Sequence, residues 1–273
     1  EQKIKDFSSQ LESIISKANL DLKFKSSSEF KQSTSKLTEA ICNSLEEALE
    51  NNQKAQLLVL KGRAFDLYEE YNKDAEDALT KAIKLDPMNK VVWNTLGNVL
   101  WKRKDYEGAK KAYESCIDNC GKNKEALRSM SMILRCFNDE KIKSYNTKES
   151  LKFAKDAVAE DFKDGESWYV LGNAYLTNYF VNAKKIDELQ NALKAYNQAE
   201  TQNFKNCADL FYNRANVLMY LEDYQESMMN FKRSDELDPS LNAKEMINIV
   251  VDRVKHVEYA INNKGKMKPK KLQ

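Results

Sequence analysis

The sequence has few of the residues that break or redirect a chain. It contains three prolines and seven glycines in 273 residues, which is too little turn chemistry for a many-stranded sheet. Lysine, glutamate, alanine and leucine, which favour helices, are abundant instead. We therefore expect an almost entirely helical chain, long enough for one large domain or two small ones.

Patterns that carry chemistry are scarce as well. The sequence has one histidine, His256, so a Ser/His/Asp or Cys/His catalytic site would have to use it. Its neighbours Lys255 and Glu258 indicate an exposed position on a helix. No GxxxxGKS, GxxxxGKT, GxGxxG or HExxH motif occurs. The sequence thus predicts no enzyme, no catalytic residue, no cofactor and no metal.

The five cysteines form neither a CxxC pair nor an even framework, which fits a reducing compartment better than a disulfide scaffold. They are Cys42, Cys116, Cys120, Cys136 and Cys207. Cys116 and Cys120 are one helical turn apart and share a face. With no nearby histidine, we favour small buried packing residues there over a metal or redox site.

No charge of one sign and no long apolar run dominates the chain. The 44 basic and 42 acidic residues give a net charge of +2, which creates no global field for nucleic acid. No window approaches the roughly 20 apolar residues of a membrane span, and the first residues lack a signal pattern. We expect a soluble intracellular protein whose electrostatic partners are met locally.

What the sequence does contain is a repeat. The segments VVWNTLGNVLW (91–101) and SWYVLGNAYLTNYF (167–180) place Trp, Leu and Gly at the same offsets. This order, followed by Ala, an aromatic residue, a small residue and Pro, is typical of the tetratricopeptide repeat, a pair of antiparallel helices A and B in about 34 residues. The glycine lets helix A approach helix B, whose aromatic side chain fills the gap. The register runs without insertion from Ala208 to Pro239.

The fold class that follows is all-α, a right-handed tetratricopeptide-repeat solenoid of about five helix pairs. We expect the repeats over residues 53–89, 90–123, 124–164, 165–207 and 208–241. Residues 1–52 are expected to form an N-terminal helical pair, residues 242–263 a capping helix and residues 264–273 a basic tail. The capping helix is expected to bury Met246, Ile249, Val250, Val254 and Val257.

The third and fourth repeats are longer than the template between helix A and helix B. The excess, between Ser131 and Ser150 and between Gly172 and Ala192, is about seven or eight residues, or two helical turns. Two interpretations are open: longer helices or a tolerated loop, which we favour, and a second partner surface. In a solenoid the two insertions would lie side by side on one edge.

Helix A side chains line the concave surface of such a solenoid. The candidate peptide-binding residues on it are Asn94, Asn98, Arg128, Arg135, Tyr169, Asn173, Asp209, Tyr212, Asn213 and Asn216. Asparagine recurs at the ninth position of three repeats, and a carboxamide both donates to and accepts from a peptide backbone. The basic residues of the third repeat and Asp209 of the fifth suit a short peptide of mixed charge.

Two other interpretations of these residues exist. In one, Asn98 and Asn173 are only solvated polar residues on an inner wall. In the other, the groove is a clamp for a C-terminal carboxylate, which needs a basic residue at the fifth position. That position holds Asn94, Tyr169 and Tyr212, so the clamp is disfavoured.

The sequence ends in a run of lysines, NKGKMKPKK, with Lys264, Lys266, Lys268, Lys270 and Lys271. A solvated tail is one interpretation. The other is a contact with a nucleic-acid backbone, which would weaken steeply with salt.

Taken together, KAQLLVLKGRA, WNTLGNVLWKRKDY, SMSMILR, SWYVLGNAYLTNYF and KGKMKPKKLQ resemble the tetratricopeptide repeat protein 5 (Strap) family. The resemblance implies a cytoplasmic adaptor at the ribosome that reads the N-terminal Met-Arg-Glu of nascent α- and β-tubulin and triggers decay of the tubulin mRNA, known as tubulin autoregulation. It also implies that Arg135 pairs with the peptide's Glu, that Asp209 pairs with its Arg, and that Lys268 and Lys270 touch ribosomal RNA.

The same resemblance implies an alternative role in the nucleus. There the family acts as a stress-response scaffold or co-factor of transcriptional acetyltransferase and p53 complexes, so the downstream partner is an mRNA-decay adaptor or a transcriptional co-activator. This chain departs from the family at Ala243, where the family has an acidic residue; whether Glu245 compensates is left open. The family also continues into a C-terminal OB-like domain beyond Gln273.

Overall fold

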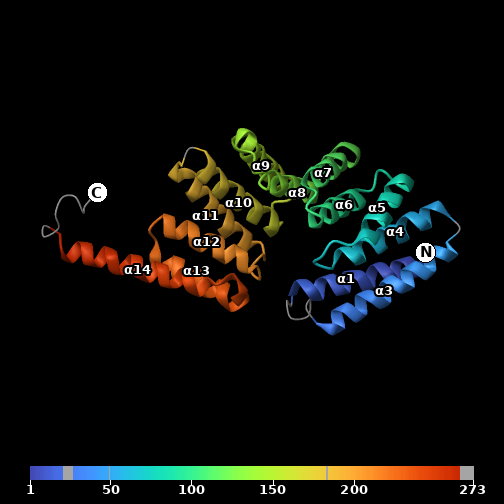
Figure 1. The fold of residues 1–273 in the computed structure, drawn as a ribbon, viewed down its shortest axis with the longest axis horizontal. Helices are drawn as coiled ribbons and strands as arrows, with labels where there is room; N and C mark the ends of the chain where they lie inside the picture. The colour runs from blue at the N-terminus through green and yellow to red at the C-terminus, as the bar shows by residue number, and fades with distance from the viewer. Residues whose placement is uncertain (21–26, 49, 183, 265–273) are drawn as a thin grey trace. The chain divides into compact units, whose positions relative to one another are not determined.

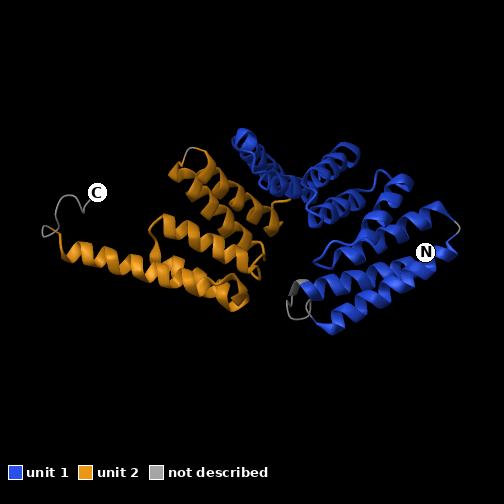
Figure 2. Ribbon diagram, viewed as in Figure 1, with its two compact units in different colours: residues 1–160 blue, residues 161–273 orange. Residues whose placement is uncertain are grey.

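The structure, a computed structural model, describes residues 1–20, 27–48, 50–182 and 184–264. Over these residues it contains thirteen α-helices, one short 3-10 helix and no strand (Figure 1). The all-helical fold expected from the scarcity of proline and glycine is confirmed. The chain divides into two compact units, residues 1–160 and 161–273 (Figure 2), which are described separately below.

Unit 1 consists of helices that pack as successive antiparallel neighbours. They are α1 (Gln2–Leu20), α3 (Ser28–Glu47), α4 (Asn51–Asp66), α5 (Lys73–Leu85), α6 (Lys90–Lys102), α7 (Tyr106–Cys120), α8 (Lys124–Leu134) and α9 (Glu140–Glu160). The closest packing is within the pairs α4 with α5, α6 with α7 and α8 with α9, while α3 packs on α1 and α4. Each pair is a helix A and a helix B in the order that the repeat register requires.

Unit 2 continues the same helix-pair pattern. It contains α10 (Gly165–Val181), α11 (Ile186–Thr201), α12 (Ala208–Tyr220), α13 (Tyr224–Leu237), the 3-10 helix η1 (Pro239–Leu241) and α14 (Ala243–Asn262). Helix α10 packs mainly on α11, α12 on α13, and α13 also on α14. None of the described helices of either unit combines the length and the apolar character that crossing a bilayer requires.

A glycine on helix A lies directly against an aromatic ring on helix B in two of the pairs. A β-carbon added to Gly97 would fall well inside van der Waals distance of the ring of Tyr113, and one added to Gly172 would do the same with Tyr196. Both tyrosine side chains are fully buried. The absence of a side chain at the glycine therefore sets how closely the two helices approach.

The tryptophan at the fourth position of helix A does more than fill the core. The indole N–H of Trp93 donates to the carbonyl of Pro87 at 2.8 Å, and that of Trp168 donates to the carbonyl of Phe162 at 2.9 Å. Each bond spans the turn that leads into helix A. The same residue thus packs its ring and satisfies a backbone carbonyl of the preceding turn.

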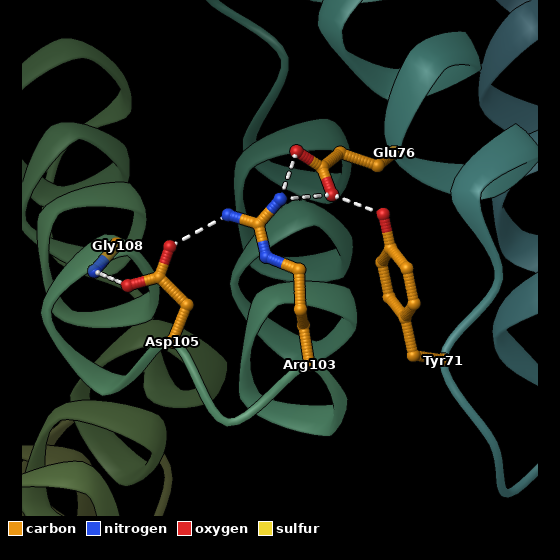
Figure 3. A network of polar contacts seen from close by, with 5 residues as sticks. All are labelled: Tyr71, Glu76, Arg103, Asp105 and Gly108. Atoms are coloured by element: carbon orange, nitrogen blue, oxygen red, sulfur yellow. Dashed lines mark hydrogen bonds and ion pairs between the residues drawn. The ribbon is translucent and has the colours of Figure 1, made fainter.

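A polar network ties the turn between α6 and α7 to the preceding helix pair (Figure 3). The Arg103 guanidinium bridges the carboxylates of Glu76 at 2.7 Å and Asp105 at 2.6 Å. The hydroxyl of Tyr71 donates to Glu76 at 2.8 Å. Asp105 also accepts the backbone N–H of Gly108 at 2.8 Å, which caps α7. The hydrogen bond from the Gly108 N–H, and to a smaller extent the one from Arg103, lowers the pKa of the Asp105 carboxyl below its usual value.

The two insertions are taken up as longer helices. Helix α10 has 17 residues, whereas the corresponding α6 and α12 have 13 each. Helix α9 has 21 residues, against 15 in α7. The longer helices of the favoured interpretation are thus observed, and a second partner surface on them stays a prediction. The insertion carried by α9 belongs to unit 1 and the one carried by α10 belongs to unit 2.

The expected burial of α14 is wrong for three of its five residues. Val250 is fully buried and Met246 packs partly on the core formed with α13. Ile249, Val254 and Val257 are 44%, 38% and 45% exposed. For Val254 and Val257 the physical reason is length: α14 has 20 residues and packs chiefly on α13, which has 14, so its second half extends past the surface that covers its first half. Ile249 lies in the covered half beside the buried Val250 and is exposed because it is on a different side of the helix.

The glycine contact can be tested by adding the missing methyl group. We expect Gly97→Ala to lower the free energy of unfolding by about 1–3 kcal/mol, because the new β-carbon forces Tyr113 or the helix backbone to move. Urea denaturation followed by circular dichroism measures the change. Lys111→Ala, at an exposed position of α7, is the control and should stay within about 0.5 kcal/mol of the unmodified chain. Equal stability of the two variants would show that the contact does not limit helix approach.

Candidate peptide-binding surface

Two of the asparagines predicted to bind peptide are engaged by the buried tyrosines. The hydroxyl of Tyr113 donates to the side-chain oxygen of Asn98 at 2.8 Å. The hydroxyl of Tyr196 donates to that of Asn173, also at 2.8 Å. In each case one tyrosine makes two contacts with helix A. Its ring packs on the glycine, and its hydroxyl binds the asparagine that follows the glycine. Residue spacing along the chain does not predict this link between core and surface.

The third asparagine of the series behaves differently because its repeat lacks the hydroxyl. Phe231 stands on α13 where the other two repeats have tyrosine. Asn216 donates instead to the backbone carbonyl of Tyr212, one turn earlier on its own helix, at 3.0 Å. The sequence carried a signal for this difference: asparagine at the ninth position has a cross-helix partner where the aromatic residue of helix B is tyrosine.

In unit 2 the predicted residues from α10 and α12 meet in one cluster. The side-chain nitrogen of Asn213 donates to the oxygen of Asn173 at 3.0 Å and, at 3.5 Å, to the hydroxyl of Tyr169. The Asn173 oxygen therefore accepts two hydrogen bonds, one from Tyr196 and one from Asn213. An amide oxygen has two lone pairs, so this acceptor is saturated.

Because the Asn173 oxygen is saturated, other atoms of the cluster have to form the hydrogen bonds to a ligand. The hydrogen bonds that occupy Asn173 leave its amide N–H groups as donors, and those that occupy Asn213 leave its oxygen as an acceptor. Both residues are half-buried. One donor and one acceptor on neighbouring side chains match the C=O and N–H of a peptide backbone. Beside them, the ring of Tyr169 lies 5.4 Å from that of Phe204, which adds an apolar wall.

In unit 1 the predicted Asn94 is half-buried and the predicted Asn98 is exposed. The nitrogen of Asn94 donates to the oxygen of Asn123 at 3.2 Å, while the oxygen of Asn94 is buried without a partner. Lys102 donates to the carboxylate of Asp66 at 2.6 Å and to the carbonyl of Tyr68 at 2.9 Å.

Burial raises the pKa of the Asp66 carboxyl, and the charge of Lys102 opposes that rise. The nearby Asn98 side chain also acts to lower that pKa. Asn98 is exposed and accepts a hydrogen bond from the hydroxyl of Tyr113.

Of the predicted charged residues, Arg135 and Asp209 lie at helix ends, whereas Arg128 lies within α8. Arg135 caps the C-terminus of α8, is half-buried, and donates from Nε to the carbonyl of Ser131 at 3.2 Å. Arg128 is half-buried on the same helix. Asp209 is exposed in the first turn of α12. The two arginines belong to unit 1 and Asp209 to unit 2.

Most of the predicted RNA contact lies outside the described residues. Lys264 is described and exposed. Lys266, Lys268, Lys270 and Lys271 fall in the segment 265–273 that the structure does not describe.

The cysteine pair of α7 and the single histidine lie at packing and surface positions, respectively. Cys116 is buried and Cys120 half-buried, both as free thiols, and burial raises the pKa of the Cys116 thiol to about 11. His256 is exposed on α14, as expected. Within the described ranges, no group of three or more His, Cys, Asp or Glu side chains is arranged to hold a metal ion.

Comparison with known proteins agrees with the repeat register. The profile of the tetratricopeptide repeat family matches residues 91–123 and 208–241. With the helix pairs described above, these matches show that the chain has the tetratricopeptide-repeat fold. More particularly, it is 36% identical over 248 residues to tetratricopeptide repeat protein 5 of Homo sapiens and 38% identical over 235 residues to that of Mus musculus. The resemblance predicted from the motifs is confirmed.

The similarity covers 89% of this chain and 56% of the human protein, and 84% of this chain and 53% of the mouse protein. The chain thus spans about half the length of these curated relatives.

Solved structures with low sequence identity share the fold. YrrB, described as a tetratricopeptide-repeat protein with an unusual peptide-binding site, aligns with a TM-score of 0.51 at 20% identity, covering 76% of this chain and 99% of YrrB. The pilF protein of Pseudomonas aeruginosa aligns with a TM-score of 0.59 at 12% identity, covering 90% of this chain and 98% of pilF. These similarities establish the fold alone.

The link between core and surface can be tested by removing one hydroxyl. We expect Tyr196→Phe to lower the free energy of unfolding by about 1 kcal/mol, because the hydroxyl bond to Asn173 is lost while the ring packing stays. Tyr259→Phe is a matched control, since Tyr259 is 62% exposed and its loss of hydroxyl should change little. Thermal and urea denaturation measure both. A loss of the same size in both variants would contradict a specific role for the Tyr196 hydroxyl.

Proposed function

We propose that this chain is a peptide-binding adaptor that recognises the N-terminal Met-Arg-Glu of nascent α- and β-tubulin at the ribosome and triggers decay of the tubulin mRNA. The observation that carries the proposal is the similarity to tetratricopeptide repeat protein 5 over 89% of this chain, since that family resemblance implies the role. We place this proposed role in the cytoplasm, where ribosomes translate tubulin.

The cluster around Asn173 supports recognition of an extended peptide. Its open donor and acceptor suit the backbone of a short segment, and such main-chain contacts give affinity without depending on sequence. The apolar wall made by Tyr169 and Phe204 suits a methionine side chain, because a thioether packs favourably against aromatic rings.

The charged residues would supply the selectivity. We assign the peptide's glutamate to Arg135 and its arginine to Asp209. The bond from Arg135 to the carbonyl of Ser131 restrains the guanidinium, and Asp209 takes part in none of the ion pairs found among the described residues. A charge-assisted hydrogen bond contributes about 1.5–3 kcal/mol.

The departure from the family at Ala243 sharpens the role of Asp209. Ala243 is fully buried against Phe231 and Val250, where it serves packing. Glu245 is exposed on the same helix. In this chain, Asp209 is therefore the residue to which we assign the peptide's arginine, without help from position 243.

The peptide assignment can be tested by titration. We expect a fluorescent peptide headed by Met-Arg-Glu to bind, and Arg135→Ala or Asp209→Ala to weaken it by at least about tenfold, because each variant loses a charge-assisted contact. Arg253→Ala and Asp187→Ala, at exposed positions outside the candidate surface, are charge-matched controls. Fluorescence anisotropy measures the dissociation constants.

Equal binding of a peptide with the same residues in scrambled order would overturn the proposal. That result would favour the alternative, a general scaffold for transcriptional acetyltransferase and p53 stress-response complexes in the nucleus.

The lysine tail gives a separate test of ribosome association. We expect Lys268→Glu combined with Lys270→Glu to reduce co-sedimentation with ribosomes translating tubulin, and the binding of the unmodified chain to fall as salt rises, because phosphate contacts release counterions. Circular dichroism checks that the fold is kept. Ribosome binding that is unchanged in the double variant would leave the tail as a solvated end only.

A further inference from the structure

Unit 1 has a hollow that the peptide-binding residues do not use. It has a volume of about 330 Å³ and is formed where helices α3, α4 and α5 meet. It is lined by three leucines, here called its floor, and three lysines, here called its rim: Leu45, Leu58 and Leu85, with Lys54, Lys81 and Lys84. No candidate residue of the sequence analysis lies among them.

The lysines at the rim are not neutralised by the chain itself. None of them takes part in an ion pair or a side-chain hydrogen bond recorded among the described residues. Glu50 and Asp77 stand one turn before Lys54 and Lys81 without pairing with them. Lys81 and Lys84 are also neighbours on one helix face, an arrangement in which like charges repel. An anionic partner would relieve that repulsion.

The apolar floor determines which side chains of a partner fit the hollow, as the lysines determine its charge. Leu85 is 40% exposed at the end of α5, and Leu45 and Leu58 are half-buried beside it. Lysine stems can cover such a surface while their ammonium groups stay in water, so the floor is accessible once the stems move aside. A hollow of about 330 Å³ lies at the small end of ligand pockets, a size suited to one or two large side chains.

We propose that this lysine-rimmed hollow docks an acidic, apolar segment of a protein partner. One or two aliphatic or aromatic side chains of the segment enter the hollow, and carboxylates on either side of them pair with Lys54, Lys81 and Lys84. The surface is independent of the peptide-binding residues of the proposed function. It gives the adaptor a second contact for a partner of opposite charge.

The test uses the full chain and a fluorescent peptide, Asp-Glu-Phe-Leu-Glu-Asp. We expect it to bind with an affinity that falls as salt rises. Lys81→Glu combined with Lys84→Glu should weaken binding by about tenfold or more, since two attractive rim contacts become repulsive. Lys73→Glu combined with Lys111→Glu makes the same charge change at exposed positions of unit 1 outside the hollow. That control should bind nearly as the unmodified chain does.

Two peptide controls separate the charge from the apolar contact. Replacing Phe-Leu by Ser-Ser should abolish binding if side chains enter the hollow, and replacing the acids by Asn and Gln should abolish it if the lysines pair with carboxylates. Leu85→Ser tests the floor without touching a charge, with thermal denaturation to check the fold. Equal losses in the two lysine variants, or binding that survives the Ser-Ser peptide, would overturn the proposal.

A free anionic amphiphile is the competing occupant. Dodecanoate carries one carboxylate and a longer apolar chain. If dodecanoate binds in a way that Lys81→Glu with Lys84→Glu abolishes while the peptide does not bind at all, the hollow is a lipid site and the proposal is wrong. Binding of the Met-Arg-Glu peptide should be unchanged in these variants, so failure here is distinguishable from failure of the proposed function.

Discussion

The contact between a helix A glycine and a helix B ring is the constraint on which the rest of the structure depends. It sets the distance between the two helices of a repeat, because nothing larger than hydrogen fits beside Tyr113 or Tyr196. It also fixes the polar surface, since the same rings carry the hydroxyls that bind Asn98 and Asn173. Core packing and the presentation of the candidate surface are therefore one arrangement, and a change in the first alters the second.

Much of the fold could be predicted because its determinants are local. Spacing along one helix identifies the glycine and the tryptophan, and the order of large and small residues identifies the helix pair. The link between Tyr196 and Asn173 could not be predicted from spacing alone, because it depends on a distance between two helices. The cluster of Asn173 with Asn213 depends in the same way on how α12 packs beside α10.

The errors have a common physical origin. Periodicity shows which face of a helix is apolar, but it does not show whether another element covers that face. Val254 and Val257 follow the same spacing as Val250, yet they lie beyond the end of the surface that α13 provides. The division between residues 160 and 161 has no local signal in the sequence, because the repeat register continues across it.

The saturated oxygen of Asn173 has a consequence for the orientation of a bound strand. The side chains of Asn173 and Asn213 offer a donor and an acceptor in the order set by the bond between them, because turning either amide alone would break that bond. A peptide presents its N–H and C=O in an order that reverses with chain direction. The pair of asparagines therefore gives the surface a direction: it can distinguish a bound strand from the same strand bound in the reverse direction.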